Sequence, residues 1–527
     1  MEERADNISE QGWCPVGTPG IVAIAVMLAT FMEVLDSTVV NVSLSHIAGN
    51  LSATIDESTW VLTSYLVSNA IVLPATGWLS MLFGRKRYYM LSVAAFVVSS
   101  FLCGFARSLD SLILYRVLQG LGGGALQPIS QAILLECFPV NRRGMGMAIF
   151  GVGVVFAPII GPTLGGWITD NYSWRWIFYI NIPIGILSMI MAQIYVVDPP
   201  YLRRGTIKVD YIGLGLLALG IGFLQVVLDT GQKHDWFQTS WILHLSIISA
   251  VSLIALVVWE LYTQHPIIDL TVFKVRNYAP GVFLIFMLGI ALYASMVLQP
   301  VLLQTLLGYS AMQSGLAMSP GGIGTLFCMP IVGYLVGKWD SRYMIIFGLS
   351  LLSLSMFIMS GYNLQISFWD AAYPRIIMGV GLAFLFVPLA TVTFAFLSQE
   401  KTGNATGIFN LLRNIGGSVG IAGVNTLLAR REQFHQSRLV ENISTFDPTF
   451  QQWFKEAVAG LTAAGQSYLN AQKQAVAVAY QMVIRQSAMM SFVDTFWLLG
   501  VVMILLVPLV FLMRRPQRSP QSPTAVH

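Results

Sequence analysis

Long apolar stretches recur along this chain and are separated by short polar segments rich in arginine and lysine. A helix that crosses a bilayer needs about 20 mostly apolar residues. Fourteen stretches meet this requirement: 19–42, 57–80, 88–106, 111–135, 144–166, 176–197, 210–228, 240–262, 279–303, 314–336, 343–362, 371–396, 404–429 and 488–513. The pattern therefore predicts an all-α polytopic membrane protein with fourteen transmembrane helices.

Composition supports this class. The chain is 55% hydrophobic and 10% charged, whereas soluble domains carry about 25% charged residues. The net charge of +4 is too small to indicate a nucleic-acid partner. The four cysteines lack the spacing of metal ligands, so we expect no metal site.

Orientation follows from the basic residues of the short loops, which favour the cytoplasmic side. One set of loops and termini holds Arg4, Arg85, Lys86, Arg87, Arg142, Arg143, Arg203, Arg204, Lys208, Lys274, Arg276, Lys338, Arg342, Lys401, Arg514, Arg515 and Arg518. The opposite short loops hold only Arg107, Arg175, Lys233 and Arg375. Both termini are therefore predicted to be cytoplasmic, in agreement with an even number of spans.

A weak internal repeat predicts two halves. The second and tenth spans each end in a glycine, a short apolar run and a basic turn, at Gly77 to Arg87 and Gly333 to Arg342. Such repeats are typical of secondary transporters. The predicted organisation is a cytoplasmic segment (1–18), a six-helix half (19–197), two inserted helices with linkers (198–278), a second six-helix half (279–513) and a cytoplasmic tail (514–527).

The second half contains a long polar loop at 430–487 on the predicted outer side. Stretches 451–461 and 466–485 lack proline and favour helix. We therefore expect one or two helices outside the membrane.

Two acids interrupt the first span. Glu33 and Asp36 are three residues apart and so share a helix face. Charges in the hydrocarbon core are costly, about 2.5–3.5 kcal/mol each on insertion scales, and each needs a reason. Coupled proton exchange by these two carboxylates is one explanation, and structural hydrogen bonds to neighbouring helices are the other.

Arg116 lies in the fourth span, which runs in the opposite direction to the first. At a rise of about 1.5 Å per residue, Arg116 and Asp36 both fall in the outer half of the membrane. An arginine opposite a carboxylate stabilises its charged form, and protonation would break the pair. The sequence therefore predicts either a proton-sensitive switch or a static pair.

The fifth span is rich in glycine and proline. Small residues allow close helix contact, and prolines kink a helix. We expect this span either to seal one side of a cavity while the halves move or to serve packing alone. The residues assigned to this gate are Gly151, Pro158, Gly161, Pro162, Gly165 and Gly166.

Polar side chains on other apolar spans are candidate substrate contacts. They are Tyr65, Asn69, Gln119, Gln127, Gln299 and Gln304. Arg413, a further cation within a span, is expected either to bind anionic ligands or to have a structural role. The glycines at 120–124 follow no strand, and no phosphate loop occurs, so we expect neither a dinucleotide site, nor ATP hydrolysis, nor an enzyme. No cofactor is expected; a proton gradient is the predicted energy source.

Together these motifs resemble the major facilitator superfamily, and within it the fourteen-span drug:proton antiporters of the EmrB type. The resemblance rests on the segments Leu35 to Val42, Arg116 to Gly124, Gly151 to Gly166 and Trp174 to Pro183, and on Pro266 with Asp269. It implies a bacterial inner-membrane exporter of hydrophobic drugs, uncouplers, fatty acids or similar amphiphiles. It also implies a periplasmic adaptor (EmrA-like), for which the loop at 430–487 is the candidate contact, and an outer-membrane channel (TolC-like).

The sequence departs from the superfamily pattern at one point. The loop after the second span usually carries an acid where this chain has Ser80, which puts a gating salt bridge there in doubt. Two other functions stay open: a proton symporter or exporter of a specific metabolite or siderophore, and a membrane scaffold or sensor without transport.

Overall fold

A computed structural model describes residues 19–514 except 140–141, 200–209, 265, 442 and 444–445. The side chains of residues 55, 56, 159 and 311 are likewise outside the description. The predicted segment 1–18, the linker cations at 203–208 and the tail beyond 514 therefore lie outside the described residues. Within the described part the chain is helical and contains no strand.

The N-terminal helices are α2 (Pro19–Val42), α3 (Leu44–Asn50), α4 (Ile55–Ser58), α5 (Trp60–Phe83), α6 (Arg85–Phe105), α7 (Leu109–Gly123), α8 (Leu126–Cys137), α9 (Arg143–Asn171), α10 (Trp176–Tyr179) and α11 (Asn181–Tyr195). The inserted elements are α12 (Tyr211–Thr230), η2 (Gly231–His234), η3 (Trp236–Gln238) and α13 (Ser240–Tyr262). The C-terminal elements are η4 (Leu270–Lys274), α14 (Tyr278–Val301), η5 (Leu302–Leu306), α15 (Ala311–Val336), α16 (Ser341–Met359), α17 (Phe368–Thr393), η6 (Gln399–Lys401), α18 (Thr402–Glu441), α19 (Pro448–Ala463), α20 (Tyr468–Leu505) and α21 (Val507–Val510).

Each predicted span falls on one of these helices or on a broken pair. Within the described residues, eleven helices are long and apolar enough to cross a membrane, or twelve if the bent helix α9 is one span. Stretch 111–135 is missing from this set because it is divided between α7 and α8, and stretch 404–429 because α18 carries many polar residues. The count of fourteen and the cytoplasmic termini stay predictions.

Glycines bring the two halves together at the end of the bundle that carries the basic loops, which we call the basic end. A Cβ on Gly77 of α5 would lie 2.5 Å from the backbone of Asn404 on α18. A Cβ on Gly144 of α9 would lie 2.8 Å from the carbonyl oxygen of Gly333 on α15. The second helix of each half thus meets the fifth helix of the other, and only glycine allows such close backbone contact. The halves are closed at this end.

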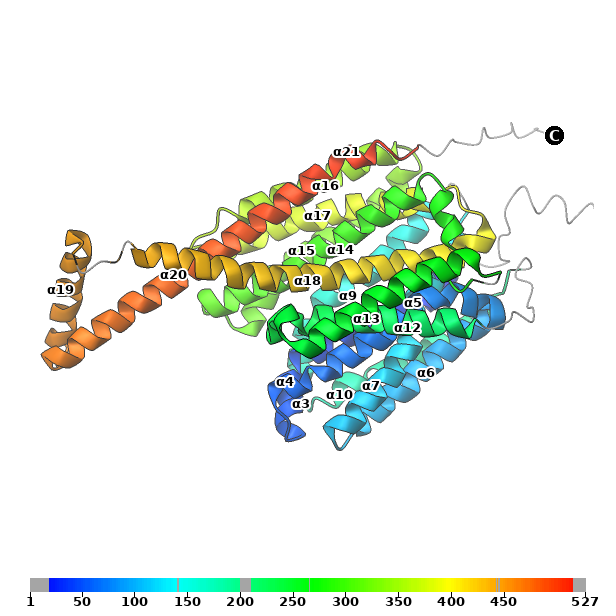
Figure 1. Cartoon of the computed structure of the whole chain (residues 1–527). Coiled ribbons are helices and arrows are strands. Elements are labelled where there is room, and N and C mark those ends of the chain that lie inside the picture. Colours follow the sequence, from blue (N-terminus) through cyan, green and yellow to red (C-terminus); the bar gives the residue numbers. More distant parts are fainter. Residues whose placement is uncertain are drawn as a thin grey trace, which may run out of the picture.

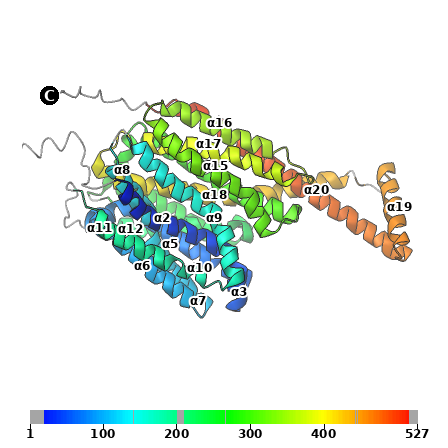
Figure 2. The same cartoon turned by 180° about the vertical axis from the view of Figure 1, so that it is seen from behind.

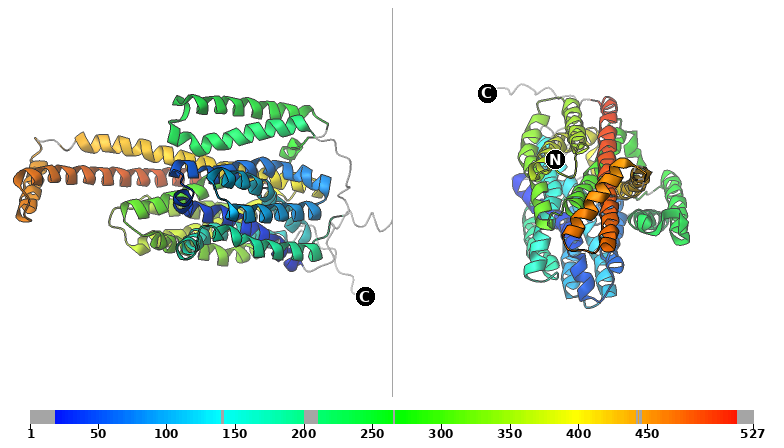
Figure 3. Two further views of the ribbon diagram at one scale, coloured as in Figure 1. Left: turned by 90° about the horizontal axis from the view of Figure 1, so that it is seen from below. Right: turned by 90° about the vertical axis from the view of Figure 1, so that its left-hand side faces the viewer.

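The inserted helices α12 and α13 form a hairpin against the side of the bundle (Figure 3, left). Thr63 of α5 donates a hydrogen bond to Asp229 of α12. Gln225 of α12 donates to the Ser418 hydroxyl of α18 at 2.7 Å. The hairpin is therefore tied to both halves through α12.

Helices α18 and α20 extend beyond the bundle at the end opposite the basic end, and α19 lies across their tips (Figures 1 and 2). Both stretches of the 430–487 loop that favour helix are helical, in α19 and α20. Asp494 of α20 joins the extension to α18 through Arg431 at 2.5 Å and His435 at 2.6 Å. Asp447 caps α19 by accepting hydrogen bonds from the backbone of Thr449 and Phe450, which lower its pKa.

Candidate functional site

Asp36 lies in the C-terminal half of α2, completely surrounded by protein. Its Oδ2 is 2.5 Å from Nη1 of Arg116 on α7. Its Oδ1 accepts hydrogen bonds from Asn181 of α11 at 2.7 Å and Gln119 of α7 at 3.1 Å. One guanidinium and two side-chain amides donate to this carboxylate, and these hydrogen bonds replace the water that burial removes.

Arg116 has further partners through Nε and Nη1, while its Nη2 has no hydrogen-bond partner among the described residues. Nε donates to the carbonyl oxygen of Val61 at 3.0 Å, and Nη1 also donates to Gln119 at 2.8 Å. The guanidinium lies over the Tyr65 ring, 4.1 Å from its centroid. Both charged side chains have no solvent exposure, so loss of either would leave the other buried and uncompensated.

Glu33 lies one turn before Asp36 but has a different kind of environment. Oε1 accepts from the Tyr65 hydroxyl and from Asn69 of α5, each at 3.0 Å, and Oε2 accepts from Gln127 of α8 at 2.6 Å. All three donors are neutral, and among the described residues no cation lies within 4.0 Å of this carboxylate. A buried carboxylate without a cation is costly unless it binds a proton.

Gln127 connects Glu33 to the other half of the molecule. Its amide oxygen accepts a hydrogen bond from Nη2 of Arg413 on α18, while its amide nitrogen donates to Glu33. One helical turn further along α8, Gln131 accepts from Asn410 of α18 at 2.6 Å. A buried polar contact thus crosses from α2 through α8 to α18, between the two halves.

The C-terminal half repeats the arginine but not the acid. Arg375 is the eighth residue of α17, as Arg116 is the eighth residue of α7. It donates to Gln299 of α14 and to the carbonyl oxygen of Ser295 at 2.6 Å. The assignment of Arg375 to a loop is therefore wrong: it is buried within α17, because its donors find acceptors on α14.

An ion pair is present at the loop after α5, although Ser80 occupies the position where the superfamily usually has an acid. Arg85, the first residue of α6, pairs with Glu136 near the end of α8, and both are buried. Ser80 and Arg85 lie beside Gly403 of α18. The acid comes from a distant helix, so this ion pair lies at the closed basic end.

The glycine and proline motif of α9 has two faces. A Cβ on Gly161 or Gly165 would clash with Thr38 or Val39 of α2, which carries Glu33 and Asp36. A Cβ on Gly151 would instead lie 2.8 Å from Met329 of the other half. The helix bends by 42° between Pro158 and Ile160, as prolines predict, and Pro162 lies in the segment beyond the bend. Gly166 is packed loosely, 3.9 Å from Val42.

The structure gathers most of the candidate substrate residues into these clusters, where Tyr65, Asn69, Gln119 and Gln127 serve as partners of the acids. Gln299 lies apart, beside Arg375. Gln304 is exposed in η5 and joins neither cluster. Sequence reasoning missed Asn181, whose signal was an amide within the apolar stretch 176–197. Within the described part no group of three or more His, Cys, Asp or Glu residues could hold a metal ion.

Buried charges between two sets of long apolar helices are typical of membrane transporters. The sequence profile described as Major Facilitator Superfamily matches residues 26–421. The chain belongs to the major facilitator superfamily, a family of transporters rather than enzymes, and is a multi-pass protein of the bacterial inner membrane.

Three relatives illustrate the similarity. The chain is 37% identical to multidrug export protein EmrB of Escherichia coli strain K12, over 94% of this chain and 95% of that one. It is 41% identical to the probable multidrug resistance protein EmrY of the same strain, over 82% and 85%. It is 36% identical to the fatty acid resistance protein FarB of Neisseria gonorrhoeae, over 94% and 96%.

The fold also has a solved counterpart. The human organic anion transporter MFSD10 (TETRAN) superimposes with a TM-score of 0.56 at 13% identity, covering 92% of this chain and all of that one. At this identity the likeness concerns the fold alone.

Proposed function

We propose that this transporter is a proton-coupled antiporter that exports hydrophobic drugs or amphiphiles by alternating access between its two halves. Its relatives are named for multidrug export, multidrug resistance and fatty acid resistance, which supports drug efflux as the general function. The observation that carries proton coupling is the pair of buried carboxylates on one helix face, one held by Arg116 and the other by neutral donors.

Asp36 has the role of a switch in this mechanism. While it is charged, it binds α2 to α7 through Arg116 and to α11 through Asn181. Its protonation removes the charge opposite Arg116 and weakens the attachment of α2 to both helices. Because α9 packs on α2 at Gly161, a shift of α2 changes the packing of the gating helix.

Glu33 couples the same event to the interface between the halves. In its charged state it orients the Gln127 amide, whose oxygen then faces Arg413 of α18. A proton on Glu33 turns one carboxyl oxygen into a hydrogen-bond donor. The amide nitrogen of Gln127 is then no longer favoured at that oxygen, and the amide is free to turn. Substrate and proton therefore exchange where α8 meets α18.

The gradient needed for this exchange is modest. One proton moving down a membrane potential of about 100 mV supplies about 2.3 kcal/mol, enough for a roughly fiftyfold gradient of a neutral solute. The close contacts at Gly77 and Gly333 must open at the basic end to admit substrate and close again before release.

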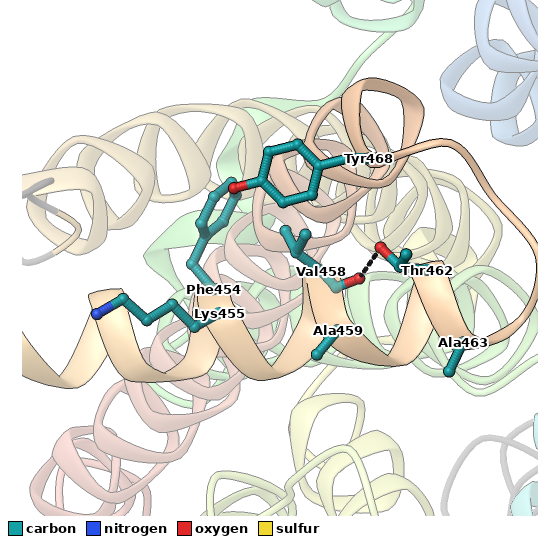
Figure 4. Close-up of a pocket in the computed structure, with 7 residues that line it drawn as sticks. All are labelled: Phe454, Lys455, Val458, Ala459, Thr462, Ala463 and Tyr468. Carbon is teal, nitrogen blue, oxygen red and sulfur yellow. Dashed lines mark hydrogen bonds between the residues drawn. The ribbon is translucent and has the colours of Figure 1, made fainter.

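The extension formed by α18, α19 and α20 is the proposed contact for a periplasmic adaptor, which in turn would join an outer-membrane channel. Phe454, Val458 and Tyr468 line an apolar hollow of about 440 Å³ at the junction of α19 and α20 (Figure 4). Tyr468 is exposed at the edge of this hollow, and an apolar hollow with an exposed aromatic side chain favours a protein partner.

The test is substrate-driven proton release from purified protein in liposomes under an imposed pH gradient. Asp36→Asn and Glu33→Gln are compared with the wild type. Antiport predicts proton release on addition of a hydrophobic compound, its loss in Asp36→Asn and its reduction in Glu33→Gln. Absence of coupled flux in the wild type with hydrophobic cations, anions and fatty acids would reject antiport and favour uptake or a non-transport role.

A further inference from the structure

Four arginines are buried in the described part of the chain, and two of them, Arg375 and Arg413, have no carboxylate within 4.0 Å among the described residues. Arg85 and Arg116 each pair with a carboxylate, and Arg375 donates to Gln299 and Ser295. Arg413 is only 2% exposed, yet among the described residues no carboxylate lies within 4.0 Å of it. It makes no direct ion pair, and the amide of Gln127 separates it from the carboxylate of Glu33.

Some of the hydrogen-bond donors of the Arg413 guanidinium have no acceptor. Nη2 donates to Gln127 and, at 3.3 Å, to Asn414. Nε and Nη1 have no hydrogen-bond partner although both are buried. A buried guanidinium with two unsatisfied nitrogens is costly, and an external anion would supply both the missing charge and the missing acceptors.

An aromatic side chain of α14 lies near Arg413. The ring of Tyr293 on α14 packs against Gly417, one helical turn beyond Arg413 on α18. A ligand that satisfies the cation and also fits this surface carries one negative group on a hydrophobic body. An anion at Arg413 would compete with the amide oxygen of Gln127, which is also bonded to Glu33.

We propose that Arg413 is the group that recognises the negative end of hydrophobic monoanions, such as long-chain carboxylates, among the exported substrates. The proposal rests on the export function proposed above and names one substrate class. The anion reaches Arg413 when α8 and α18 separate, and its arrival releases Gln127. Anion binding and the environment of Glu33 are thereby linked through one amide.

The test is equilibrium binding to the purified full-length protein in a non-ionic detergent at pH 8, without any gradient. Radiolabelled dodecanoate is compared with dodecanol, which has the same chain but no charge. The variants are Arg413→Gln and Arg413→Lys. The matched control is Arg430→Gln, which removes an exposed arginine from the same helix.

We expect Arg413→Gln to weaken dodecanoate binding roughly 10- to 100-fold, the value of a charge-assisted hydrogen bond, while dodecanol binding changes less than about twofold. Arg413→Lys should fall between, and Arg430→Gln should bind as the wild type does. Three results would overturn the proposal: no dodecanoate binding by the wild type, unchanged dodecanoate binding in Arg413→Gln, or an equal loss of both ligands. Because no gradient is present, a failure of proton antiport leaves this result intact.

Discussion

The ion pair of Asp36 and Arg116 allows stability and coupling to be measured separately. Both side chains are fully buried, so solvent does not screen their interaction. Removal of one member of a buried pair costs about 3–5 kcal/mol, because the other charge is left uncompensated. For Asp36→Asn we expect the upper end of this range, because an amide oxygen that still accepts from Asn181 and Gln119 turns the amide nitrogen, a donor, toward Nη1 of Arg116.

The double variant Asp36→Asn with Arg116→Gln removes both charges together. Its free energy of unfolding should fall by less than the sum of the two single losses, with an interaction energy of about 2 kcal/mol or more. Unfolding is measured by titration of mixed micelles with a denaturing detergent. Proton release is measured on the same four proteins in liposomes.

The two measurements together separate a switch from a static pair. A switch predicts that the double variant regains stability but not substrate-driven proton release. If the double variant regains both, the pair is a structural element and the coupling role is refuted. If Asp36→Asn alone leaves stability unchanged, the buried pair itself does not exist as described.

Three further changes test other features. Glu136→Gln leaves Arg85 buried without its acid and should destabilise the protein by about 3 kcal/mol or more in the same titration; an unchanged midpoint would contradict this. Gly333→Val should slow export because the side chain prevents closure of the basic end, whereas Gly215→Ala, where a Cβ meets nothing within 4 Å, should export normally. Asp447→Ala should speed hydrogen exchange at the start of α19. Because the pKa of Asp447 is lowered on folding, its cap is present at neutral pH and lost as the pH falls through that pKa; equal exchange in both proteins at neutral pH would exclude a capping role.

The helices were predictable because each apolar stretch of about 20 residues has one stable form in a bilayer. The proximity of Asp36 and Arg116 could also be predicted, because the direction of each span and the rise per residue place the two side chains at the same depth in the membrane. The breaks in helices were harder: nothing in stretch 111–135 marks the division between α7 and α8 except its run of glycines.

The contacts between the two halves could not be predicted from the pattern of apolar and polar residues. Depth alone does not say which way a side chain faces, so the bond from Arg413 to Gln127 and the pairing of Arg85 with Glu136 could not be deduced. Arg375 was misplaced for the same reason, because a charge near the end of a span can face solvent or the bundle.

The buried charges described above are divided unequally between the halves. In α2 to α11 they are three acids, Glu33, Asp36 and Glu136, against two arginines, whereas the described residues of α14 to α21 contribute two buried arginines and no fully buried acid. When Glu33 is ionised, these buried groups sum to one negative charge in the first half and two positive charges in the second, which favours contact between the halves. A single proton on Glu33 abolishes the negative side of this attraction, so one titration acts on the whole interface as well as on its nearest neighbours.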